Sequence, residues 1–96
     1  MTVKFITNDK GSPAGKLADA ELHFSGSLLD GLKLVGFAVW ERRTGGRNVT
    51  FPARQYSVNG ERRSFALLRP LNGETSAQEA IRQCILDAAV RVETDV

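Results

Sequence analysis

The first half of the chain shows the alternation of apolar and polar positions that is typical of β-strands. Residues 2–8 and 17–24 place apolar side chains at about every second position, which predicts strands with one buried and one solvated face. Residues 32–40 are almost continuously apolar. Their length and their content of Val, Phe and Trp favour a central strand, in which Gly36 marks a bulge or a close crossing.

Turn signals divide the next part of the chain into shorter strands. The sequence TGG at residues 44–46 predicts a hairpin loop, and residues 48–52 form a short strand that ends in a proline. Asn59 and Gly60 form a two-residue turn signal, after which residues 63–70 return as a strand.

The last segment has the apolar period of an amphipathic helix. Thr75 and Ser76 are candidate N-cap residues, and Ser76 with Glu79 fits a capping box. The pattern predicts a helix of about 17 residues, or roughly 25 Å. Its main apolar stripe consists of Ala77, Ile81, Cys84, Ile85, Ala88 and Val92.

These elements predict one α+β domain over residues 1–96. Its sheet is an antiparallel meander of about five strands, and the C-terminal helix covers the apolar face of that sheet. A chain of 96 residues has room for one hydrophobic core. A second, weaker apolar row on the helix, Leu86 and Val90 with Ala89 close by, predicts a face for a partner subunit.

Charge is segregated along the chain, although the net charge is only +2. Residues 42–69 carry seven arginines and a single acid, Glu61. From Glu74 onward, five acids face two arginines. Arginine, which occurs here without any lysine, suits bidentate contacts to phosphate and stacking on rings. The segregation favours a basic surface, and the alternative is a solvated sheet surface with ion pairs.

Three segments in this order resemble a known family. They are TGGRNVTFPAR, NGERR and RPLNGETSAQEAIRQCILDAAV, and together the region from about Leu34 to Val92 resembles the stage V sporulation protein G (SpoVG) family of bacterial regulators. The resemblance implies a sheet with a C-terminal helix, a homodimer, and site-selective binding of DNA and RNA without catalysis.

The resemblance also implies which residues contact nucleic acid. The family has a basic pair after the proline, where Arg54 matches the first residue and Gln55 departs from the second. Arg62 or Arg63 matches the basic residue that follows the turn. Arg69 replaces a histidine of the family pattern.

The candidate contacts surround the predicted hairpin and the preceding loop. The arginines would hold the phosphate backbone, Gln55 can bond a base edge, and Tyr56 could stack an unpaired base. The alternative is that Tyr56 packs on the sheet rim and that the arginines only solubilise the surface. The full candidate set is Arg42, Arg43, Arg47, Arg54, Gln55, Tyr56, Arg62, Arg63 and Arg69.

The sequence offers little support for an enzyme, a metal site, a cofactor or a small-molecule substrate. His23 is the only histidine, and Asp19 and Glu21 beside it are better explained as a charged outer face. Cys84 lies on the apolar stripe, where an inert thiol is expected. Trp40 is expected in the core or at a dimer interface, and the alternative is a platform on which a base stacks.

We therefore expect a cytoplasmic, dimeric, DNA- or RNA-binding regulator, without a leader peptide or membrane span. The alternative is a phage or plasmid adaptor whose basic hairpin docks on an acidic protein.

Overall fold

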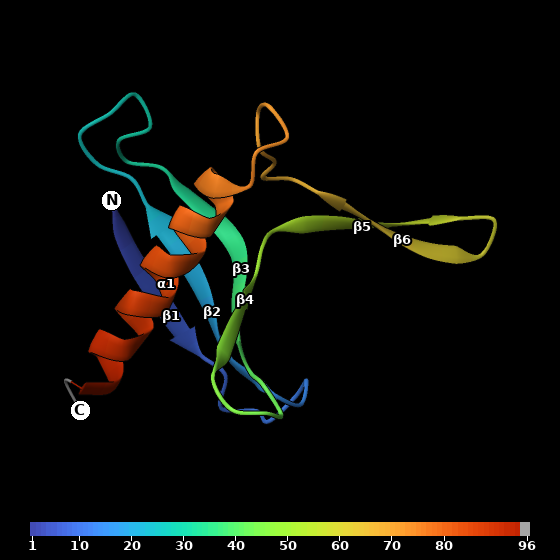
Figure 1. Cartoon of the computed structure of the whole chain (residues 1–96), viewed down its shortest axis with the longest axis horizontal. Helices are drawn as coiled ribbons and strands as arrows, with labels where there is room; N and C mark the ends of the chain where they lie inside the picture. Colours follow the sequence, from blue (N-terminus) through green and yellow to red (C-terminus); the bar gives the residue numbers. More distant parts are fainter. Residues whose placement is uncertain (95–96) are drawn as a thin grey trace.

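The computed structural model describes the backbone of residues 1–94 and the side chains of residues 1–91. It has an α+β fold with one C-terminal helix, as predicted (Figure 1). The elements are β1 (Thr2–Thr7), β2 (Lys16–His23), β3 (Lys33–Glu41), β4 (Arg47–Thr50), β5 (Ala53–Val58), β6 (Glu61–Ala66) and α1 (Ser76–Thr94).

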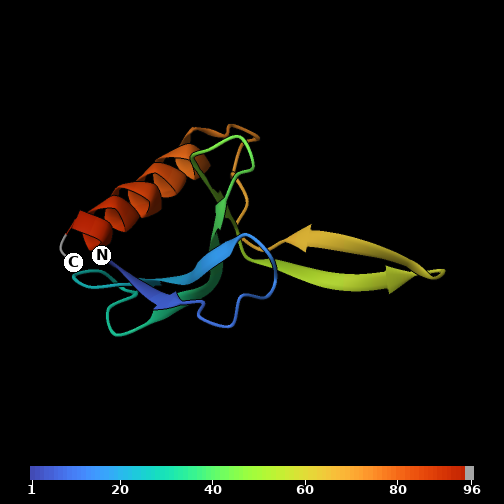
Figure 2. The same cartoon turned by 90° about the horizontal axis from the view of Figure 1, so that it is seen from below.

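The strands form two antiparallel sheets, whereas the sequence predicted one sheet of about five strands. Strands β1 to β4 form a meander in that order, and β5 pairs only with β6 in a separate two-stranded sheet. Figures 1 and 2 show this second sheet as a hairpin that projects away from the body of the domain. We call it the β5–β6 hairpin.

The hairpin separates from the meander at Pro52, which lies between the end of β4 at Thr50 and the start of β5 at Ala53. Proline has no N–H to donate to a continued ladder. Pro52 is buried and packs against the backbone of Gly36 in β3, where a built Cβ would lie 2.8 Å from the Pro52 Cβ. Gly36 has a φ of +109°, a conformation that side chains disfavour. The close crossing predicted at Gly36 is thus the point where the hairpin leaves.

The core lies between α1 and one face of the four-stranded sheet. Alternate residues of β2, β3 and β4 point toward the helix, and Ile85 reaches down from it. The fully buried side chains are those of Ala20, Leu22, Phe37, Val39, Val49 and Ile85. Phe51 joins this layer by an edge-to-face contact with Phe37, at a centroid distance of 5.2 Å.

The helix confirms the predicted period, although its two apolar rows differ from expectation. Ala89 is buried and Leu86 packs against the core, so this row faces the chain's own sheet and leaves only Val90 clearly exposed. Ala77, from the main stripe, is exposed. Val92, the last residue of that stripe, lies outside the described side chains.

The N-terminus of the helix is capped differently from the predicted box. Thr75 provides the first accepting carbonyl, because the Glu79 N–H donates to the Thr75 carbonyl oxygen at 2.9 Å. The Glu79 carboxylate pairs with Arg82. The N-cap is therefore Thr75, one of the two candidates, and the helix begins at Ser76.

Candidate nucleic-acid interface

The β5–β6 hairpin is built by its turn and by strict pairing of its strands. Asn59 has a φ of +52° and Gly60 a φ of +82°, the pair of positive angles that a two-residue hairpin turn requires. Six residues pair on each strand, from Val58 opposite Glu61 to Ala53 opposite Ala66. All twelve are exposed.

Pairing divides the hairpin into two chemically different faces, because side chains of directly opposed residues point the same way. One face pairs Ala53 with Ala66, Gln55 with Ser64, and Ser57 with Arg62. Its side chains are small or hydrogen-bonding, and the Gln55 side-chain amide donates to Ser64 Oγ at 3.3 Å. We call this the polar face.

The opposite face combines aromatic and apolar groups with arginines. Arg54 opposes Phe65, Tyr56 opposes Arg63, and Val58 opposes Glu61. The side chain of Leu67 continues the alternation that begins at Phe65, and the Leu67 N–H donates to the Pro52 carbonyl oxygen at 3.0 Å. We call the face of Tyr56, Val58, Phe65 and Leu67 the apolar face.

The structure thus brings together some candidate residues and separates others. Arg54, Tyr56 and Arg63 share one side of the ribbon, whereas Gln55 and Arg62 share the other. A ligand on a single face cannot contact the complete set. A ligand that receives the ribbon edge-on or surrounds it can contact both faces.

The hairpin arginines differ in their existing contacts. Arg63 pairs with Glu61 at 3.4 Å, but both side chains are more than half exposed, so the pair is weak in water. No ion pair joins Arg54 or Arg62 to an acid among the described residues. Arg69, at the base of the hairpin, lies over the Phe65 ring at 4.8 Å. Most of this positive charge is available to a polyanion.

The remaining three candidates lie in a different place. Arg42 and Arg43 are in the loop between β3 and β4, and Arg47 begins β4, whereas the hairpin leaves from the other end of that strand (Figure 1). The Arg42 guanidinium donates to Asn48 Oδ1 at 3.5 Å. Arg47 is half-buried and lines a cavity of about 260 Å³ beneath the helix. The nine residues therefore form two basic groups.

The charged outer face predicted around His23 is present on the side of the sheet that the helix does not cover. Glu21 accepts hydrogen bonds from Lys33 at 3.3 Å and lies 3.0 Å from His23 Nε2. These contacts, that with His23 first, lower the pKa of Glu21. Lys16 and Asp19 pair at 2.7 Å. The residues described here contain no cluster of three metal-ligating side chains.

Trp40 also lies on the side of the sheet away from the helix. Its indole N–H donates to Thr50 Oγ1 at 2.8 Å, and the residue is half-buried. Trp40 therefore lies outside the core, so the first of its two expected places is wrong. Its place at a dimer interface stays a prediction.

Comparisons of the chain with protein-family models, with curated proteins and with solved structures give no match. The resemblance to the SpoVG family therefore depends on the three sequence segments alone. Within the described residues, no helix has the length and apolarity needed to cross a membrane.

Proposed function

We propose that this chain is a non-catalytic nucleic-acid-binding regulator that acts as a dimer in the cytoplasm, in the manner that the SpoVG resemblance implies. The observation that supports the proposal best is the projecting β5–β6 hairpin. It carries Arg54, Arg62 and Arg63 on a two-stranded ribbon, and no further strand of the described chain pairs with this ribbon (Figure 2). Guanidinium groups on an exposed ribbon suit phosphate contacts.

The dimensions of the hairpin favour duplex DNA. Six residues per strand give a ribbon about 20 Å long, and a two-stranded ribbon fits the major groove of B-DNA, which is about 12 Å wide. The deep and narrow major groove of an RNA duplex does not admit such a ribbon. RNA would then bind through unpaired segments.

The two faces of the ribbon support different roles. On the polar face, Gln55 and Arg62 have the amide and guanidinium groups that recognise the base edges of A and G. Arg54 and Arg63 extend from the other face on long side chains that can reach phosphates at the groove wall. Arg42 and Arg43, at the far end of β4, would contact the backbone outside the groove.

A fluorescence-anisotropy titration tests the proposal. Labelled duplex DNA, single-stranded DNA and RNA are each titrated with the protein at about 50 and 200 mM salt. If the arginines neutralise several phosphates, affinity falls by orders of magnitude between the two salt concentrations. We expect duplex DNA to bind most tightly. Absence of binding to all three probes at the lower salt would contradict the proposal and favour the acidic-protein adaptor.

A further inference from the structure

Within the described part of the chain, the apolar face of the β5–β6 hairpin is covered by no other strand or helix, although Arg69 lies over the Phe65 ring. Tyr56, Val58, Phe65 and Leu67 are 42%, 41%, 48% and 59% exposed. The strands pair with each other and not with the meander. A lone two-stranded hairpin is marginally stable in water, and burial of an apolar face against another layer is what stabilises such a ribbon. The hairpin therefore needs a complementary surface.

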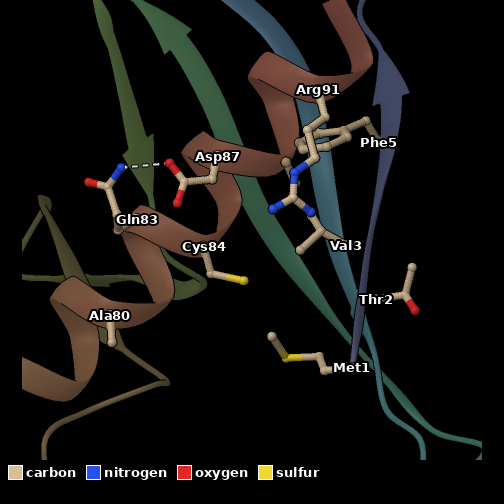
Figure 3. Close-up of a pocket in the computed structure, with 10 residues that line it drawn as sticks. Met1, Thr2, Val3, Phe5, Ala80, Gln83, Cys84, Asp87 and Arg91 are labelled. Carbon is tan, nitrogen blue, oxygen red and sulfur yellow. Dashed lines mark hydrogen bonds between the residues drawn. The ribbon is translucent and has the colours of Figure 1, made fainter. Parts of the chain in front are cut away.

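A complementary surface exists on the opposite side of the molecule. A groove of about 580 Å³ runs between α1 and β1, with apolar side chains that include Val3, Phe5, Cys84 and Ala88. Figure 3 shows the Cys84 side chain directed from the helix into this groove, with Val3 and Phe5 on the strand side. The groove exists because a helix about 10 Å wide cannot cover four strands spaced about 4.8 Å apart.

The groove and the hairpin match in backbone and in side chains. β1 is an edge strand with one unpaired side, and it has six residues, as do β5 and β6. Both sheets have one apolar and one polar face. A hairpin strand added to the free edge of β1 would place the apolar face of the hairpin beside Val3 and Phe5, under the helix.

Charge supports the same pairing. The hairpin segment, residues 53–69, has four arginines and one glutamate, a net charge of +3. Residues 74–91, which include the described helix surface, have three acids and two arginines, a net charge of −1. The rim of the groove includes Gln83 and Asp87, which are hydrogen-bonded at 2.9 Å. Arg54 and Arg63, on the same side as the apolar face, would approach this rim, although Arg91 also lines it.

The occupant of the groove must come from another molecule. The sheet order places β1 and β4 at opposite edges, and the hairpin leaves from β4, away from β1 (Figure 1). We propose that the hairpin of one copy docks by its apolar face in the groove between α1 and β1 of a second copy, and that the exchange is reciprocal. This inference names the surfaces of the proposed dimer. It does not depend on nucleic-acid binding, because the polar face stays accessible and the long side chains of Arg54 and Arg63 would lie at the rim of the groove, where they can still reach phosphates.

Mass measurement by size-exclusion chromatography with light scattering tests the proposal without nucleic acid. We expect the wild type to be a dimer, and both Phe65→Asp and Val58→Asp to be monomers with intact circular-dichroism spectra. Ser64→Asp is the matched control, because it adds the same charge beside Phe65 on the polar face; it should remain dimeric. A monomeric wild type, or loss of the dimer in Ser64→Asp alone, would overturn the proposal. A monomeric wild type would leave the apolar face to a different protein.

A thiol cross-link locates the contact, because Cys84 is the only cysteine in the sequence. In Val58→Cys, a short bismaleimide should join two copies through Cys84 in the groove. Ser57→Cys, on the polar face, should cross-link poorly. The product of Val58→Cys should disappear when Cys84→Ala is added. Equal cross-linking of the two variants, or a product that persists without Cys84, would contradict docking in the groove.

Discussion

The substitution Gly36→Ala tests how the hairpin is fixed to the sheet. Gly36 combines a φ of +109° with a contact in which an added Cβ would lie 2.8 Å from Pro52 Cβ and 3.3 Å from Pro52 Cα. The unfavourable backbone conformation costs about 1–3 kcal/mol. Displacing a buried proline costs about 1–3 kcal/mol more, as in other overpacked sites.

The two costs together lower the free energy of unfolding by about 2–6 kcal/mol. Each kcal/mol shifts the melting temperature of a domain of this size by about 4–8 °C. A fall of roughly 10 °C or more is therefore expected in a circular-dichroism melt. Because Pro52 sets the direction of the hairpin, nucleic-acid binding should weaken below the melting transition as well.

Gly45→Ala is the matched control. Gly45 has a φ of +92°, but an added Cβ would meet nothing within 4 Å. Only the backbone cost of about 1–3 kcal/mol applies. The Gly36 variant should therefore melt clearly below the Gly45 variant. Equal melting temperatures would refute the argument that contact with Pro52 fixes the hairpin.

Two further substitutions test the core and the outer face. Ile85→Ala removes a fully buried side chain. It should lower the free energy of unfolding, measured by urea titration, by about 2–5 kcal/mol. A loss well below 1 kcal/mol would mean that the helix does not pack on the sheet as described. Glu21→Gln tests the lowered pKa of Glu21. A carboxylate with a lowered pKa stabilises the folded state at neutral pH, and this stabilisation is lost as the pH falls through the folded-state pKa. The variant should melt below the wild type at neutral pH and together with it in acid, and an equal difference at both pH values would contradict this account.

The local elements could be predicted from the sequence because their signals are local. The alternation around Ala20 and Leu22 identified β2, the period around Ile85 identified the helix, and Asn59 with Gly60 identified the turn. Each of these patterns depends on residues within a few positions of one another.

The arrangement of the hairpin could not be predicted because it depends on distant contacts. Alternation around Phe65 indicates a strand but not the sheet edge on which it pairs, and nothing in the local sequence shows that Pro52 packs on Gly36. The division of the candidate site follows from register: a shift of one residue would have placed Gln55 beside Arg63. The pairing of Gln55 with Ser64 is fixed by the two-residue turn.

The groove between α1 and β1 could not be predicted from the sequence either. The helix stripe identified Cys84 and Ala88 as apolar positions that cover the sheet, and both line the open groove instead. Sheet width decides this outcome, and the width depends on how many strands pair, which the helix pattern does not contain. The exposed apolar face, in contrast, could have been predicted, because Tyr56 and Val58, and likewise Phe65 and Leu67, are two positions apart and so share one face of a strand.

The most direct test of the central claim is the salt dependence of duplex-DNA affinity in the wild type and in the triple variant Arg54→Ala, Arg62→Ala, Arg63→Ala. Each phosphate contact contributes about 0.9 to the slope of log K against log salt concentration. The variant should therefore have a slope that is smaller by about 2–3, with weaker binding at low salt and an almost unchanged thermal melt, because all three side chains are exposed. An unchanged slope in a folded variant would show that these arginines do not contact the DNA phosphates.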